Sequence, residues 1–91
     1  RLMDVTIIDT PAAYEHGKLL IPAATVDLKV ADDVNIFVMN CATGLTLKIG
    51  GSTNPEITNV THFSYKGSKT SFWISNPETE DITISYSTCA L

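Results

Sequence analysis

The sequence predicts an all-β protein, built as a single antiparallel β-sandwich or jelly-roll-like module of seven to eight short strands. Two observations support this prediction. First, apolar and polar residues alternate with a period of two in several short segments, and no segment shows the 3.6-residue period of a helix. Second, Gly, Pro, Asn and Asp residues that favour turns separate these segments at short, regular spacing. A chain of 91 residues is sized for one domain with one core.

The clearest predicted element is a β-hairpin at residues 34–51. In its first strand, Phe37 and Met39 lie on the face opposite to Ile36 and Val38, because side chains alternate along a strand. Large apolar residues therefore occupy both faces. Either this strand is central and covered on both sides, or its outer face contacts another subunit.

Further alternating segments and breaks surround this hairpin, and all are assigned to one domain at residues 1–91. Residues 1–18 are expected to form an N-terminal arm or an added strand. The other predicted strands are residues 3–9, 24–30, 60–65, 70–75 and 81–87. The predicted turns and loops are residues 12–18, 31–33, 40–44, 50–55, 66–69 and 76–80.

The composition argues against several classes of function. The net charge is −4 and the lysines are scattered along the chain. Binding to DNA or RNA depends on Lys and Arg that neutralise phosphates, so we expect no nucleic-acid partner. No apolar run approaches the roughly 20 residues of a membrane-spanning helix, and no secretory signal peptide is recognisable. We therefore expect no membrane segment.

The two cysteines, Cys41 and Cys89, leave three states open. A disulfide between them would close a long loop and stabilise the fold by about 3–4 kcal/mol. They can equally remain two separate buried thiols, since free cysteine behaves as a small apolar residue. A bond between two subunits is the third state. Spacing alone does not show whether the two side chains meet, and two cysteines are too few for a structural zinc site.

No set of residues specifies a reaction, a metal or a cofactor. His16 and His62 lack Asp or Glu partners at a metal-ligand spacing. No serine lies in a recognisable nucleophile turn, and residues 50–53 lack the Lys of a phosphate-binding loop. We therefore expect a protein that is not an enzyme and binds no cofactor. Asn59 begins an Asn-Val-Thr glycosylation sequon, which matters only in a secretory or archaeal surface context.

Trp73 indicates a possible function more clearly than the catalytic, metal-binding and glycosylation motifs do. It lies on the face of its strand opposite to Phe72 and Ile74. Either both faces of this strand are covered, with Trp73 at the edge of the core, or Trp73 contacts a partner, since aromatic residues are common interface anchors. With Phe37 and Met39 it forms the set of predicted interface residues. The expected partners are other protein subunits in a homo-oligomer such as a trimer.

Four short motifs occur in a characteristic order: Ile21-Pro22-Ala23, residues 40–52, Lys66-Gly67-Ser68 and residues 76–87. Their order resembles that of small jelly-roll or β-sandwich modules in virion proteins of tailed phages, namely head decoration proteins, head fibres and tail adhesins. The similarity covers residues 19–88. It implies a structural or binding role in a virion and brings no catalytic residues with it.

These observations together predict a non-enzymatic structural virion protein of the capsid-decoration or fibre type, which acts by protein–protein assembly. The expected localisation is the virion or the extracellular space. Two alternatives remain open. One is a carbohydrate-binding adhesin module in which Trp73, Tyr65 and Tyr14 stack on sugar rings. The other is a secreted inhibitor or toxin domain held by a disulfide between Cys41 and Cys89.

Overall fold

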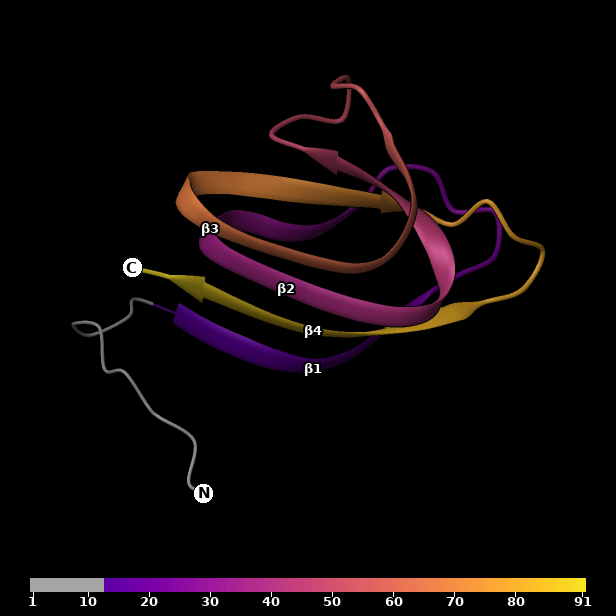
Figure 1. Ribbon diagram of the computed structural model, residues 1–91, viewed down its shortest axis with the longest axis horizontal. Coiled ribbons are helices and arrows are strands. Elements are labelled where there is room, and N and C mark those ends of the chain that lie inside the picture. Colours follow the sequence, from indigo (N-terminus) through magenta and orange to yellow (C-terminus); the bar gives the residue numbers. More distant parts are fainter. Residues whose placement is uncertain (1–12) are drawn as a thin grey trace.

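Four strands form one antiparallel sheet, and Figure 1 shows how the sheet curls over itself. The computed structural model describes residues 13–91, so the predicted strand at residues 3–9 lies outside the described residues. The predicted all-β class is confirmed, and residues 13–91 contain no helix. The strands are β1 (Ala13–Ile21), β2 (Leu28–Ile49), β3 (Ile57–Ser75) and β4 (Ile82–Ala90), arranged in the order β1-β4-β2-β3.

Residues 13–91 form four strands, fewer than the seven to eight predicted for the chain, because β2 and β3 bend without ending. These strands contain 22 and 19 residues. Register shifts mark bulges between their sections, so the turns predicted at residues 31–33 and 66–69 fall inside continuous strands. The paired sections are residues 28–31 with 72–74, residues 36–40 with 62–66, and residues 45–49 with both 57–60 and 72–75.

The predicted hairpin at residues 34–51 is wrong. Residues 36–40 pair with β4 on one side and with β3 on the other, and residues 45–49 pair only with β3. Residues 40–44 therefore continue β2 instead of turning the chain. Gly44 lies directly against Asn59 of β3. An alternating pattern interrupted by glycine is a local signal, and it does not distinguish a turn from a bulge in a long strand.

The N-terminal part of the fold also differs from the prediction. Residues 12–18 were expected to form a loop, but most of them belong to β1, because β4 supplies a continuous ladder from Ala13 to Ile21. The strand predicted at residues 24–30 begins only at Leu28. The loops at residues 50–55 and 76–80 are confirmed, as is the last strand, although it runs from Ile82 to Ala90.

The core lies on the inner face of the curled sheet. Phe37 and Phe72 stack with their ring centroids 4.6 Å apart, which joins two sections of the sheet across the interior. Phe63 and Tyr65 pack edge-on against Phe72 at 6.0 Å and 5.3 Å. The other buried apolar residues are Ile21, Ala31, Val34, Met39, Leu45, Leu47, Val60, Ile74, Ile82 and Ile84.

Phe37 and Met39 belong to this core, which corrects their assignment as interface residues. Both are 0% exposed, whereas Ile36 and Val38 are half-buried on the opposite face. The alternation was recognised correctly, but the buried face is the one with the larger side chains. β2 lies between β4 and β3 at this point, and its bulkier pair fills the interior. Neither side chain is left at the surface for a partner.

Asn76 connects two loops at one end of the sheet and is only 1% exposed. Its side-chain amide donates hydrogen bonds to the carbonyl oxygens of Ile21, Pro22 and Glu80 at 3.1, 3.2 and 2.9 Å. Its Oδ1 accepts a hydrogen bond from the backbone N–H of Glu78 at 2.9 Å. Both the amino group and the oxygen of this buried amide are therefore hydrogen-bonded, and the chain before β2 is attached to the chain before β4.

Candidate binding surfaces

The first candidate surface is the part of the sheet's non-core side that covers β1, β4 and the sections of β2 and β3 at residues 36–40 and 62–66, and we call it the outer face. Residues that pair directly across antiparallel strands share one face, so the register defines its rows. The three rows, each crossing β1, β4, β2 and β3, are Lys18-Ser85-Asn40-His62, His16-Ser87-Val38-Ser64 and Tyr14-Cys89-Ile36-Lys66. Leu20 and Thr83 form a shorter row beside them.

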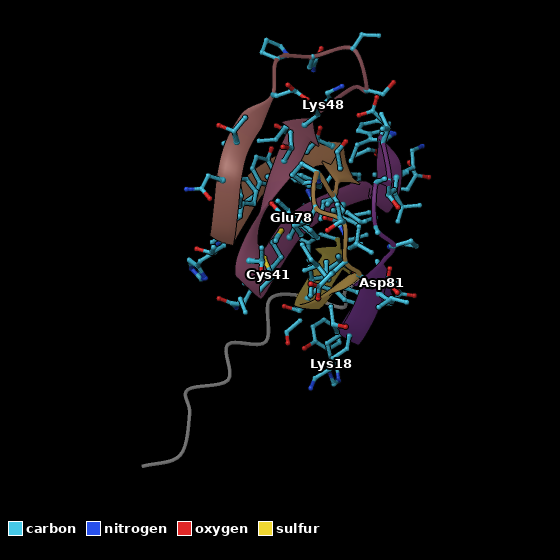
Figure 2. All side chains as sticks on the ribbon, turned by 90° about the vertical axis from the view of Figure 1, so that its right-hand side faces the viewer. Lys18, Cys41, Lys48, Glu78 and Asp81 are labelled. Carbon is cyan, nitrogen blue, oxygen red and sulfur yellow. The ribbon has the colours of Figure 1, made fainter. Side chains whose placement is uncertain are left out.

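A groove of about 400 Å³ lies over β4 on the outer face. Short side chains form its floor, because β4 contributes Ser85 and Ser87 there. Longer side chains border the floor on either side, with Tyr14 and Lys18 from β1 and Asn40 from β2 among them. Figure 2 shows Lys18 projecting away from the β1 ribbon. Small residues on the middle strand and larger ones beside it thus create the hollow.

The charge of the outer face differs from that of the whole chain. The protein carries ten Asp and Glu residues and a net charge of −4. Among the described residues, the register nevertheless places no Asp or Glu on the four rows of the outer face. Lys18, Lys66 and both histidines of the chain lie there instead. This face is therefore the more positive part of an acidic protein.

Two contacts order the polar groups of the outer face. The Nδ1 atom of His62 lies 2.6 Å from Oδ1 of Asn40. This contact involves only the oxygen of the Asn40 amide, so the Nδ2 group can donate hydrogen bonds to a ligand. The rings of Tyr14 and His16 lie 5.5 Å apart and are tilted by 40°. Tyr14 is 62% exposed, so a large part of its side chain is open to solvent.

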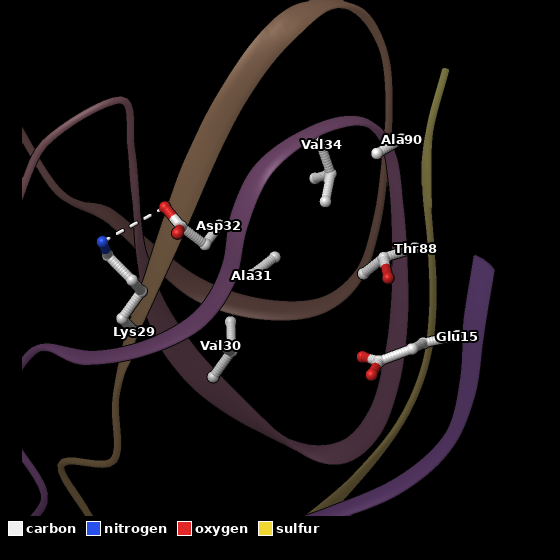
Figure 3. A pocket seen from close by; sticks show the side chains of 8 residues that line it. All are labelled: Glu15, Lys29, Val30, Ala31, Asp32, Val34, Thr88 and Ala90. Carbon is white, nitrogen blue, oxygen red and sulfur yellow. Dashed lines mark hydrogen bonds and ion pairs between the residues drawn. The ribbon is translucent and has the colours of Figure 1, made fainter. Parts of the chain in front are cut away.

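A second cavity, of about 340 Å³, opens between β1, β4 and the start of β2 (Figure 3). Glu15 projects into it from β1, opposite Val30 and Ala31 of β2. Thr88 lines it from β4 and is itself buried. Glu15 thus lies on the inner side of the edge strand β1, in the same row as Thr88 and Phe37.

Asp32 lies at the rim of this cavity and holds the bulge of β2. Its Oδ1 accepts hydrogen bonds from the Ser71 hydroxyl at 2.9 Å and from Lys29 Nζ at 3.2 Å. The bond from Ser71 and then the contact with Lys29 lower the pKa of Asp32 below its ordinary value. The hydroxyl of Ser71 also accepts a hydrogen bond from the backbone N–H of Asp33, whose φ is +55°. These contacts indicate a structural role for Asp32.

Trp73 lies on a different section of the sheet, between two lysines. It pairs with Lys29 on one side and Lys48 on the other, and Lys29 Nζ lies 5.2 Å from the centroid of its ring. Lys48 forms an ion pair with Asp27 at 2.9 Å and donates to the carbonyl oxygen of Ser52 at 2.9 Å. Trp73 is half-buried, so part of its ring remains at the surface.

The structure does not bring the three predicted stacking residues onto one surface. Tyr14 belongs to the outer face, whereas Tyr65 packs inward against Phe72 and donates a hydrogen bond to the Ser68 carbonyl oxygen at 2.8 Å. Trp73 lies beside Lys29 on another section of the sheet. An adhesin site made of Tyr14, Tyr65 and Trp73 together is therefore not formed.

Cys41 and Cys89 are separate thiols, which corrects the disulfide considered from the sequence. Cys89 pairs with Ile36, and Cys41 lies five residues further along β2, or roughly 17 Å away along an extended strand. Bonded cysteines need Cα atoms within about 7 Å of each other. The Cys41 thiol donates to the Thr43 carbonyl oxygen at 3.1 Å, and burial raises its pKa. The structure therefore lacks the intrachain bridge on which the toxin or inhibitor alternative depended.

The remaining candidate residues lie apart from one another. Within residues 13–91 no group of three or more His, Cys, Asp and Glu residues is placed to hold a metal ion. The same residues contain no helix long and apolar enough to cross a membrane. Asn59 is exposed and has a φ of +57°, so its sequon is open to solvent.

Comparison with protein families, with curated proteins and with solved structures found no match for this chain. The site residues that sequence reasoning missed are the polar ones of the outer face, above all Lys18, Ser85 and Asn40. In the sequence, these residues show only that they alternate with apolar residues along their strands. The cross-strand register that unites them depends on pairing between distant segments, which the sequence does not display.

Proposed function

We propose that this protein is a non-enzymatic structural subunit of a virion, of the capsid-decoration or fibre type, which acts by protein–protein assembly. The resemblance of its turn motifs to those of phage virion modules supports this proposal, as does its all-β architecture. The same proposal places the protein in the virion or the extracellular space and gives it further copies or capsid subunits as partners.

A sandwich or jelly-roll arrangement is part of the proposal. β2 and β3 each contribute several paired sections to the sheet, and these sections lie on both sides of the Phe37–Phe72 stack. Sections that face each other across a core correspond to the short strands of such a module. Modules of this kind present loops and strand edges to their partners.

The observation that carries the assembly proposal is the open edge of β1. Within residues 13–91, β1 pairs with β4 on one side only, and it does so over nine residues. An unpaired strand edge is a template on which another chain can add a strand. Leu20, near the end of β1, is 53% exposed and adds apolar area beside this edge. The β1 edge is therefore the proposed contact.

A charge at the β1 edge tests this contact. Leu20→Glu should abolish oligomers or binding to the particle, because a charge and its water shell oppose strand addition at this edge. Val26→Glu is the matched control, since Val26 is 76% exposed and lies in the loop before β2. Light scattering measures the assembly, and circular dichroism checks the fold. Equal behaviour of the two variants would contradict the β1 contact.

Trp73 is the other proposed contact residue. Trp73→Asp should weaken assembly while the sheet stays intact, because the residue is half-buried and lies outside the fully buried core. Phe37 is unsuitable for this purpose. It is 0% exposed, so a charge at this position would unfold the protein instead of blocking a partner.

A further inference from the structure

We propose that the groove on the outer face binds an acidic glycan, meaning an oligosaccharide that carries carboxylate or sulfate groups. This ligand-binding function goes beyond the assembly proposed above. It uses Tyr14, Lys18, Asn40 and the floor of Ser85 and Ser87.

The first argument is charge. A folded protein with a net charge of −4 repels anions over most of its surface. The outer face differs from the chain as a whole, because its described rows contain Lys18, Lys66, His16 and His62 and no carboxylate. A ligand with isolated negative charges matches this pattern. Nucleic acid matches it less well, since its binding needs many closely spaced Lys and Arg contacts.

The second argument is the chemistry of the groove. Its floor consists of the Ser85 and Ser87 side chains, which can both donate and accept hydrogen bonds. The Asn40 Nδ2 donor is positioned by the contact of Oδ1 with His62 at 2.6 Å. Val38 is the one aliphatic side chain among the groove's described lining residues. The hydroxyl and amide groups of these side chains can form hydrogen bonds with the hydroxyl groups of a sugar.

The third argument is the placement of Tyr14 and Lys18. Both side chains lie on the outer face of β1, four residues apart, which corresponds to roughly 13 Å along a strand. Tyr14 is 62% exposed and can stack on the apolar face of a sugar ring. Lys18 can pair with a carboxylate or sulfate at the other end of the groove. The groove thus offers a ring platform and a cation at a distance suited to a short oligosaccharide.

Binding should be measured by titration calorimetry with three probes: a sulfated heparin oligosaccharide, an oligogalacturonate and neutral dextran. The intact chain should bind at least one acidic probe and not dextran. Lys18→Ala should weaken that binding at least tenfold. Ser85→Tyr should do the same without a change in charge, because it fills the groove floor. Both positions are exposed, so circular dichroism should show an unchanged fold.

Lys29→Ala is the matched control. It removes the same charge from an exposed lysine that lies outside the outer face, and it should leave the affinity within about twofold. Absence of binding to both acidic probes would overturn the proposal. Equal losses in Lys18→Ala and Lys29→Ala, with none in Ser85→Tyr, would also overturn it, because they would indicate only general charge attraction.

The assembly proposal can fail independently of this one. Light scattering on the same variants reports assembly, while calorimetry reports glycan binding. If Lys18→Ala and Ser85→Tyr abolish assembly and the wild type binds no acidic probe, the outer face is a protein contact and the glycan proposal is wrong.

Discussion

At the scale of single residues, Phe37 and Met39 show which face of β2 is buried in the core. Phe37 and Met39 were recognised in the sequence as one face of an alternating strand, yet they were assigned to a partner surface. The aromatic cluster around Phe72 shows why they are inside, since Phe37 stacks on Phe72 at 4.6 Å. The period of a strand reveals two faces, but with apolar residues on both it does not reveal which one is buried.

Phe37→Ala should destabilise the protein by about 3–5 kcal/mol, because it removes a fully buried ring and leaves a cavity. Val38→Ala, one position away on the outer face, should cost less than about 1 kcal/mol. Urea unfolding followed by Trp73 fluorescence measures both free energies. A larger loss for Val38→Ala would mean that the faces are assigned the wrong way round.

The buried hydrogen bonds of Asn76 were not predicted from the sequence, because Asn76-Pro77 was interpreted only as a turn. Asn76→Ala should cost about 2–4 kcal/mol, since the carbonyl oxygens of Ile21, Pro22 and Glu80 each lose a hydrogen-bond donor next to the core. Asn76→Asp should cost more, because a carboxylate oxygen would face those carbonyls. Asn54→Ala is the control, since Asn54 is exposed and donates one hydrogen bond to the Ile49 carbonyl oxygen at 2.6 Å. Similar unfolding free energies for Asn76→Ala and Asn54→Ala would contradict this role.

At the scale of elements, the sequence located the extended segments better than the connections between them. Loops at residues 50–55 and 76–80 were predicted because Gly, Pro and Asn cluster there. The bends at residues 31–34 and 66–69 have the same local chemistry, but neighbouring pairs on both sides keep them in strands. Strand pairing is a non-local property, so the choice between turn and bulge could not be made from alternation alone.

The contact between Gly44 and Asn59 tests the pairing of β2 with the start of β3. A Cβ atom at residue 44 would overlap Oδ1 of Asn59 and approach its Cα to 3.0 Å. Gly44→Ala should therefore destabilise the protein by about 1–3 kcal/mol. Adding Asn59→Gly should recover most of this loss, because it removes the side chain and glycine readily adopts a φ of +57°.

Gly51→Ala is the control for this pair, since its Cβ would meet neighbouring atoms only at 3.6 Å or more. Thermal unfolding of Gly44→Ala, of Gly51→Ala and of the double variant Gly44→Ala with Asn59→Gly gives the comparison. If Gly44→Ala is as stable as Gly51→Ala, residues 40–44 do not lie against β3 as described.

At the scale of the whole molecule, the distribution of charge and of open edges determines what the protein can bind. The net charge was available from the sequence, but the absence of Asp and Glu from the described outer face follows only from the register of four strands. The free edge of β1 was likewise hidden, because most of this strand was expected to be a loop. The candidate surfaces therefore depend on topology more than on any motif.

The mass of the native assembly tests the proposed function most directly. The protein isolated from its source under native conditions, and the purified full chain at increasing concentration, should both be measured by light scattering or mass photometry. The proposal predicts that the chain belongs to a large particle, or forms a defined oligomer that Leu20→Glu dissociates. A monomer at all concentrations, found free of any particle, would contradict a structural subunit that acts by assembly.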